Sequence, residues 1–303
     1  MEGRLIRIRK PGKITDGLWH LGCGNSGIYV LEGSVSSIII SAGKSYIIPE
    51  VLKQLEAYHV DVNKIDKLLI LHSHFDHVGV VPFFMRYLPG ISVYASSRAI
   101  RNLKNRKVIK MINTLNREDA RARGLLDELA VCDWEWGDGF GAIEVRDGDR
   151  ISLGDTAIRV LETPGHSQCS ISAYVPRLKA LFPSDGGGVP FRNTIIVYGT
   201  SDYSEFQNSL LKLSELEVCF LCVDHYGYVV GEEAGQFLGR AVGLAAKLRA
   251  VIEDAYRRLG NAEKVVDELI AAYSEENADG IVSGDLFRAT WQSIVRNVTV
   301  SMH

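Results

Sequence analysis

The sequence of 303 residues is poor in cysteine and methionine and has no excess of positive charge. Its 34 lysines and arginines stand against 37 aspartates and glutamates, so the formal net charge is −3. This balance argues against general nucleic-acid binding through a basic surface. Five cysteines are scattered along the chain. Cys219 and Cys222 have C-x-x-C spacing, but they lie in the apolar run 218–223, which predicts a buried strand instead.

Long apolar segments are also missing. No run reaches the length of a membrane span, and residues 1–4 open no signal peptide, so we expect a cytoplasmic protein that binds no membrane. The composition, 46% hydrophobic and 23% charged, is that of a soluble globular protein with a sizeable core. The length is typical of about two domains.

The densest chemistry in the chain is a short polar cluster. Residues 67–71 read as a buried strand, and three histidines and an aspartate follow it directly. These are His72, His74, Asp76 and His77. In an extended segment, His72 and His74 project to the same side. Imidazole and carboxylate groups suit zinc, iron or manganese. The alternative is a polar loop without a ligand.

Three further strand ends carry residues of the same kind. His166 lies on a Pro-Gly turn after the strand 157–161. Asp185 follows the strand 180–182 and precedes three glycines, which let a backbone approach a ligand closely. His225 follows the strand 218–223. Each alone is a weak signal, but together with the first cluster they indicate a metal site at the edge of a sheet.

The remaining pattern indicates an α/β fold. We expect strands at 14–21, 27–31, 37–40 and 91–94 in the first half, with a helix from Pro49, and strands at 144–146, 150–153 and 170–175 in the second. Residues 97–131 look like a helical insertion with nine basic and four acidic residues. It is either a solvated helical face or a lid that attracts an anionic substrate. Trp134 and Trp136 either pack this insertion down or line a pocket.

After residue 232 the pattern becomes helical. Apolar residues recur at helical spacing within 237–259, 265–273 and 286–298, and Gly260 predicts the end of the first helix. The residues of the first apolar stripe are Phe237, Ala241, Leu244, Leu248, Val251, Ala255 and Leu259. We expect these helices to pack against the rest of the protein or over its pocket. A homodimer interface is the alternative.

The order His-x-His-x-Asp-His, Pro-Gly-His-Ser, strand-end Asp and strand-end His resembles the metallo-β-lactamase fold superfamily. The full ligand set looks like the glyoxalase II type of hydrolase, and the C-terminal helices resemble those of glyoxalase II and of quinolone-signal response proteins. The resemblance implies a four-layer αββα sandwich over residues 1–231, with a helical insertion at about 97–138. Residues 232–303 would form a C-terminal helical extension.

The resemblance also implies two divalent metal ions, zinc first, with iron or manganese as alternatives. His72, His74 and His166 would hold the first ion, Asp76, His77 and His225 the second, and Asp185 would bridge both. Asp76, which would orient the nucleophile, and His225 are also predicted to be catalytic. Two features depart from the family pattern. Leu71 stands where threonine is frequent, and Asp224 and Tyr226 flank the last histidine where glycines are usual.

The favoured function is a hydrolase in which a metal-bridging hydroxide attacks an ester, thioester, lactone or phosphoester of a small molecule. An anionic molecule is favoured if the basic insertion acts as a lid. The alternatives are an iron-dependent oxidoreductase acting on sulfur compounds or oxygen, and a non-catalytic regulator that binds a ligand. No nucleic-acid partner is expected, because no module for one is found. Tyr198, Phe191, Tyr226 and Tyr228 are predicted pocket residues, with simple packing as the alternative.

Overall fold

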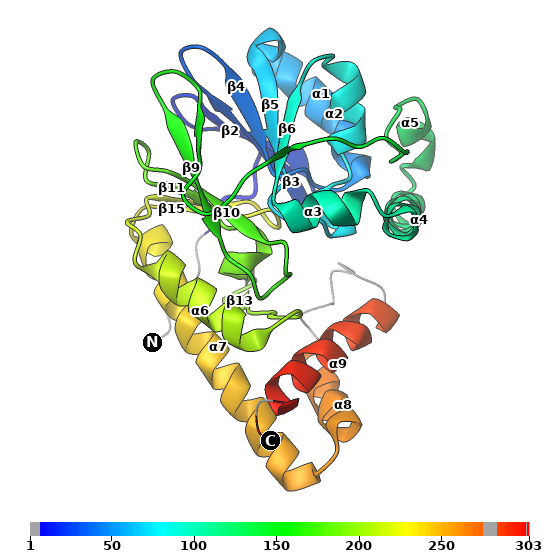
Figure 1. Cartoon of the computed structure of the whole chain (residues 1–303), viewed down its shortest axis with the longest axis vertical. Helices are drawn as coiled ribbons and strands as arrows, with labels where there is room; N and C mark the ends of the chain where they lie inside the picture. Colours follow the sequence, from blue (N-terminus) through cyan, green and yellow to red (C-terminus); the bar gives the residue numbers. More distant parts are fainter. Residues whose placement is uncertain (1–6, 275–283, 301, 303) are drawn as a thin grey trace.

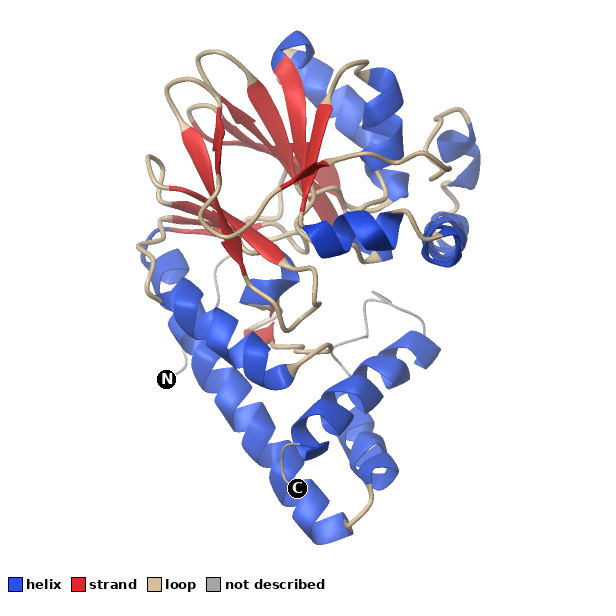
Figure 2. Ribbon diagram, in the orientation of Figure 1, coloured by secondary structure: helices blue, strands red, loops and turns tan. Residues whose placement is uncertain are grey.

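The computed structural model describes residues 7–274, 284–300 and 302. Two sheets face each other, and helices cover the outer face of each (Figure 1). Figure 2 shows the same layers by secondary structure, with long helices extending away from the sheets. The predicted four-layer αββα sandwich with a C-terminal helical extension is therefore confirmed. The predicted boundary between the two parts, at residue 231, stays a prediction.

The first sheet has seven strands in chain order, β1 to β7. The strands are β1 (Gly12–Thr15), β2 (Leu18–Cys23), β3 (Ser26–Glu32), β4 (Ser37–Ile40), β5 (Ile65–Leu69), β6 (Ser92–Ala95) and β7 (Ile143–Glu144). Strands β1 to β4 form an antiparallel meander, and β4 to β7 are parallel. The sheet thus begins as the predicted meander and continues as an α/β unit.

The second sheet has the strand order β15-β14-β11-β10-β9-β8. Its strands are β8 (Arg150–Ser152), β9 (Ala157–Glu162), β10 (Ile171–Val175), β11 (Ala180–Phe182), β14 (Phe220–Cys222) and β15 (Tyr228–Val230). A separate hairpin joins β12 (Val189–Phe191) and β13 (Thr194–Ile196). Cys222 ends β14 and is buried in the core, while Cys219 directly precedes the strand and is partly exposed. The C-x-x-C spacing therefore belongs to a strand and its approach, as predicted.

Alternating side chains of the strands fill three hydrophobic cores, one between the sheets and one under the outer helices of each sheet. In β4, Ile38 and Ile40 pack between the two sheets, while Ile39 packs under the outer helices of the first sheet. The same period-two pattern holds in the second sheet, where Val160 faces the first sheet and Leu161 faces the outer helices. The central strands β3, β4, β10 and β11 are buried on both faces, which explains their nearly continuous apolar sequence.

The outer helices belong to three groups. Helices α1 (Ile48–Ala57) and α2 (Val81–Tyr87) cover the first sheet, and α6 (Tyr203–Ser214) covers the second. The extension consists of α7 (Gly231–Leu259), α8 (Ala262–Tyr273) and α9 (Gly284–Val300). Short 3-10 turns are η1 (Ser45–Ile47), η2 (Val62–Lys64), η3 (Phe75–His77) and η4 (Ser184–Gly187). Among the described residues, no helix is long and apolar enough to cross a membrane.

The predicted insertion forms α3 (Ser97–Leu103), α4 (Arg106–Ala122) and α5 (Leu126–Ala130). Trp134 and Trp136 lie in the core under it, 6% and 5% exposed. The indole nitrogen of Trp136 donates to the backbone oxygen of Val78 at 3.0 Å. The two tryptophans therefore pack the insertion down, which was one of the two predicted roles.

Several details of the prediction are wrong, among them one strand of the first sheet and one residue of the α7 stripe. The expected strand 14–21 is two strands, because Asp16 and Gly17 form a turn in which Gly17 has φ +72°. A glycine adopts this conformation at little cost, but the apolar run around it concealed the turn. In α7, Val251 of the predicted stripe is exposed, while Ala245 and Ile252 are buried in its place. Helix α7 ends at Leu259, before Gly260, as predicted.

Candidate metal centre

Four loops at one edge of the sandwich bring the predicted site residues together. The loop after β5 carries His72 and His74, and the following turn η3 carries Asp76 and His77. The second sheet supplies the rest: His166 between β9 and β10, Asp185 in η4 after β11, and His225 between β14 and β15. All seven predicted residues lie in this cluster, so the site spans both sheets. Their assignment as metal ligands stays a prediction.

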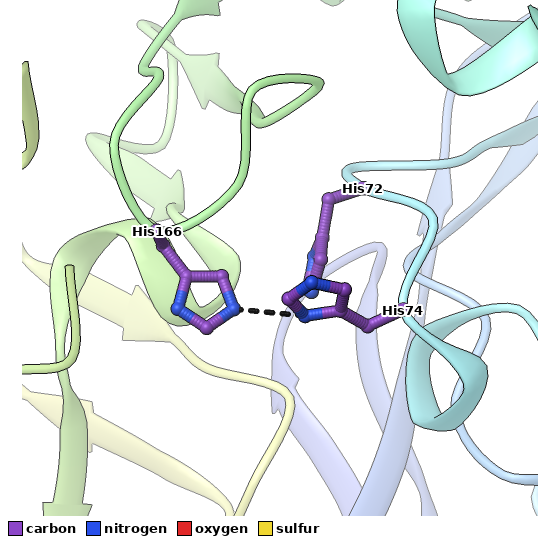
Figure 3. A group of neighbouring side chains, drawn as sticks. All are labelled: His72, His74 and His166. Atoms are coloured by element: carbon purple, nitrogen blue, oxygen red, sulfur yellow. Dashed lines mark hydrogen bonds between the residues drawn. The ribbon is translucent and has the colours of Figure 1, made fainter. Parts of the chain in front are cut away.

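His72, His74 and His166 form the first group of candidate ligands. Figure 3 shows the three imidazoles converging, with His74 Nδ1 3.1 Å from His166 Nε2. The Nε2 atom of His72 is fully buried and has no hydrogen-bond partner. Ligand atoms on a tetrahedral zinc ion are roughly 3.3 Å apart, given Zn–N bonds of about 2.0–2.1 Å. The spacing and the unpartnered nitrogen both fit a metal ion.

Asp76, His77 and His225 form a second group. The Nε2 atoms of His77 and His225 are 3.1 Å apart. The Oδ2 atom of Asp76 lies 3.5 Å from His225 Nε2 and 3.7 Å from His77 Nε2. Two imidazoles and one carboxylate again face a common point, and the side chains are almost completely buried.

Asp185 lies between the two groups. Its Oδ2 is 3.5 Å from His166 Nε2 of the first group and 3.2 Å from His77 Nε2 of the second. Its Oδ1 is buried without a hydrogen-bond partner, 3.8 Å from His225 Nε2. A carboxylate in this position can coordinate ions in both groups.

An outer layer of hydrogen bonds orients four of the imidazoles through Nδ1. The Nδ1 of His166 lies 2.9 Å from the backbone oxygen of Tyr198, and that of His225 lies 2.7 Å from the backbone oxygen of Asn25. Because a carbonyl oxygen only accepts, each Nδ1 must carry the proton. In its neutral form, each ring would therefore present an unprotonated Nε2 to the centre.

Ser184 and Asp224 orient the other two rings. Asp224 accepts from His77 Nδ1 at 2.7 Å. Ser184 donates its hydroxyl proton to Asp224, so its oxygen can accept from His72 Nδ1, 3.1 Å away. The outer layer thus joins a ring of the first group to a ring of the second.

Burial and neighbouring charge set the protonation of the first group. Burial, together with nearby His77, holds the pKa of His72 well below its usual value. Burial and His166 lower the pKa of His74 to about 4. Both rings are therefore neutral at pH 7, which is the form that binds a metal ion.

The carboxylates of Asp76 and Asp185 remain ionised despite their burial. Burial alone raises the pKa of Asp185, but the charges of His77 and His225 outweigh it and bring the pKa well below the usual range. For His77, burial on its own would lower the pKa. The negative charges of Asp185 and Asp76 outweigh this effect, so the pKa of His77 is raised well above its usual value. Concentrated carboxylate charge around imidazoles is what a divalent cation neutralises.

A glycine allows the close packing that places His166. Gly165 has φ +124°, and a Cβ atom there would lie 2.1 Å from the backbone nitrogen of Phe206 in α6. No larger residue fits without moving the helix or the loop. The Pro-Gly turn seen in the sequence is thus required by the contact with α6.

The other predicted site residues have different roles. Phe191, Tyr226 and Tyr228 are buried, and Phe191 packs edge-on against Tyr226 at 5.6 Å. Tyr198 packs against Trp291 of α9 at 5.5 Å. The three buried rings are packing residues, which was the alternative to a role in a substrate pocket. Asp224, known from the sequence only as a departure from the family pattern, proves to be a positioning group.

Comparisons with known proteins point to one superfamily. The family model described as the metallo-beta-lactamase superfamily matches residues 21–225. The metallo-beta-lactamase fold-containing protein ST1585 of Sulfurisphaera tokodaii is 25% identical over 211 residues, 67% of this chain and 73% of its own. The hydroxyacylglutathione hydrolase of Francisella tularensis subsp. novicida is 25% identical over 195 residues, 62% of this chain and 58% of the hydrolase.

A solved structure extends the similarity to nearly the whole chain. The metallo-beta-lactamase family protein TTHA1429 of Thermus thermophilus superposes with a TM-score of 0.66. The match covers 96% of this chain and 95% of the other, at 16% sequence identity. At this identity the likeness establishes the fold alone.

Proposed function

The chain belongs to the metallo-beta-lactamase superfamily, and from this premise we propose that it is a hydrolase that uses two divalent metal ions. The proposed substrate is an ester, thioester, lactone or phosphoester of a small molecule. The distant similarity to a hydroxyacylglutathione hydrolase supports the glyoxalase II-like branch and, within it, a thioester.

The position of Asp185 carries the proposal. Its carboxylate reaches Nε2 of His166 in one group and Nε2 of His77 in the other. A structural zinc site is usually closed by four protein ligands around one ion. Here Asp185 lies within reach of both three-residue groups, which is an arrangement that can hold two catalytic ions.

The donor set fits zinc, with iron and manganese as alternatives, because it consists of imidazoles and carboxylates without sulfur. Such ions supply a water molecule of lowered pKa and polarise the bond under attack. His72, His74 and His166 would hold the first ion, and Asp76, His77 and His225 the second, with Asp185 contacting both. Asp76 would also accept a hydrogen bond from the attacking water and so orient it.

Metal analysis tests this function directly. The full chain, purified without chelators, is expected to contain two equivalents of metal per chain and to hydrolyse members of a panel of thioesters, lactones and phosphodiesters. One equivalent of iron without hydrolysis would favour the oxidoreductase alternative. Absence of bound metal after reconstitution would contradict both and favour a ligand-binding regulator.

The variant His74→Ala separates the site from the rest of the fold. Loss of an inner ligand is expected to remove most of the metal and to lower kcat/KM by at least about 100-fold. His59→Asn, at an exposed histidine outside the cluster, is the control and should change neither quantity. If His74→Ala kept both its metal and its activity, the assignment would be wrong.

A further inference from the structure

A cavity of about 360 Å³ opens beside His74, on the side of the insertion. We call it the α3 cavity, since α3 supplies Arg98, Arg101 and Asn102 to its wall. The loops that carry the candidate ligands supply the opposite wall, including Ser73 and His74. No aspartate or glutamate of the described chain lines it. The cavity therefore combines a candidate metal ligand with two guanidinium groups.

Helix α3 is fastened to both loops of the metal centre. Asn102 Nδ2 donates to the hydroxyl of Ser73, the residue before His74, at 2.9 Å. Ser96, which caps α3, donates to the backbone oxygen of Cys169 in the loop that follows His166, at 2.7 Å. These bonds fix the helix relative to the first group of candidate ligands, so its side chains have a defined position there.

The two arginines of α3 are available to a ligand. Three residues apart on a helix, Arg98 and Arg101 lie on the same face. Arg98 donates to the side-chain oxygen of Gln168, a neutral group, and neither arginine is paired with a carboxylate of the described chain. By contrast, Arg106 and Arg117 of α4 each form an ion pair. Ion pairs thus neutralise part of the positive charge of the insertion, while the guanidinium groups of Arg98 and Arg101 beside the candidate centre have no carboxylate partner in the described chain.

We propose that the α3 cavity is a subsite for an anionic group of the substrate, a carboxylate or a phosphate. Guanidinium groups bind both anions through paired, charge-assisted hydrogen bonds. The scissile bond then lies at the metal centre, next to His74, and the anionic end of the molecule lies under α3. The inference rests on the proposed hydrolase and adds a substrate class to it.

The test compares two substrates that differ only in charge. Mono-p-nitrophenyl adipate carries a free carboxylate, and its methyl ester does not. The metal-loaded full chain is expected to prefer the anionic substrate in kcat/KM, and Arg101→Ala should reduce this preference about 10- to 100-fold, mainly through KM. Arg98→Ala should act in the same direction, and Arg101→Lys should retain part of the preference.

Lys104→Ala is the matched control, because it removes one exposed positive charge directly after α3 but outside the cavity. It should keep the preference. An equal loss in Lys104→Ala and Arg101→Ala, or no preference in the wild type, would overturn the subsite while leaving the hydrolase intact. Competition by inorganic phosphate and by succinate against the anionic ester distinguishes the two anions: the physiological group is the one whose competition weakens most in Arg101→Ala.

If neither ester is hydrolysed, calorimetric titration of succinate and phosphate into the metal-loaded chain tests the subsite separately. Saturable binding that is weakened in Arg101→Ala and kept in Lys104→Ala supports it. Equal binding by all three proteins contradicts it. A protein that binds the anions but hydrolyses no ester would contradict the proposed hydrolase and support the subsite. Hydrolysis without selective anion binding would do the reverse.

Discussion

Asp224 fixes the orientation of His77 through a 2.7 Å contact with Nδ1, and it also accepts a hydrogen bond from Ser184. A carboxylate behind a metal-binding imidazole sets its tautomer and increases its basicity. The Oδ1 atom of Asp224 is buried without a hydrogen-bond partner, and its Oδ2 contacts both His77 and Ser184. The outer layer thus contributes negative charge as well as geometry.

Asp224→Asn is expected to weaken metal binding at the second group by about 10- to 100-fold, since an amide keeps the shape of the side chain but loses its charge. Competition with a chromophoric chelator measures the affinity. Asp254→Asn, which removes an exposed carboxylate of α7, is the control. Unchanged affinity in Asp224→Asn would show that the carboxylate has only a packing role.

His20 gives the fold a dependence on pH that is separate from the metal centre. Burial between Tyr29 and Tyr228 lowers its pKa from 6.5 to about 4. Between these values the unfolded chain binds the proton and the folded chain does not, so stability falls as the pH decreases from about 6.5 towards 4. The contribution lost between pH 7 and pH 5 is about 2 kcal/mol.

Urea unfolding at several pH values checks this. His20→Gln, which has no titrating ring, is expected to lose less stability between pH 7 and pH 5 than the wild type does. His59→Asn removes an exposed histidine and should follow the wild type. Parallel pH profiles for wild type and His20→Gln would contradict the prediction.

The seven candidate ligands could be predicted from the sequence because each is a histidine or aspartate in the loop that follows a strand. The outer layer could not be predicted in this way. The partner of His77 is 147 residues away, and the partner of His225 is a backbone oxygen 200 residues away. Every residue has a backbone oxygen, so the sequence does not indicate which one accepts a hydrogen bond. Such pairs can be identified only from the folded structure.

At the scale of elements, the central strands were predictable because they are apolar on both faces. The errors in the predicted ends of the strands have a common cause. Apolar runs continue beyond the hydrogen-bonded part of a strand, so the predicted strand 218–223 shortens to β14, residues 220–222. The insertion was recognised from its charge and helical composition. Its contacts with the loops of the candidate centre were not, since they depend on single polar side chains of α3 and α4.

Asn116 of α4 is the clearest of these contacts. Its Oδ1 accepts from the backbone nitrogen of Ser45 at 2.9 Å, and its Nδ2 donates to the backbone oxygen of Phe75 at 2.8 Å. The side chain is 1% exposed. It therefore ties the turn that carries Asp76 and His77 to both α4 and η1.

Asn116→Ala leaves two buried backbone groups without partners and is expected to lower the free energy of unfolding by about 2–3 kcal/mol. Urea unfolding of the metal-loaded protein measures the change. Lys110→Ala, on the exposed side of the same helix, should change it by less than about 0.5 kcal/mol. A loss in Asn116→Ala no larger than that of the control would mean that water replaces the amide.

At the scale of the whole molecule, the candidate centre joins the two halves of the sandwich. His72, His74, Asp76 and His77 come from the first sheet, while the three other candidate ligands come from the second. The C-terminal extension is also connected to the candidate centre, through hydrogen bonds that lead to His166. Asn297 of α9 donates to the backbone oxygen of Thr200, whose hydroxyl donates to the backbone oxygen of His166.

Removal of metal is therefore expected to destabilise the entire fold. A ligand present at 100 times its dissociation constant stabilises by about 2.7 kcal/mol, so dialysis against dipicolinate should lower the melting temperature by about 5–10 °C. Readdition of zinc should restore it. His74→Ala, melted with and without the chelator, should show little difference. An equal shift in both proteins would indicate an effect of the chelator itself.

The loop that holds His225 is bound by the hairpin of β2 and β3, near the beginning of the described chain. Asn25 accepts from His225, the backbone nitrogen of Gly27 donates to Asp224 at 3.1 Å, and the hydroxyl of Tyr29 donates to Val223 at 2.6 Å. Synthesis proceeds from the N-terminus, so this hairpin leaves the ribosome long before its partner loop. The second group of candidate ligands is completed only when that loop has emerged and docked, so a metal ion held by this group would be acquired late in the maturation of the protein.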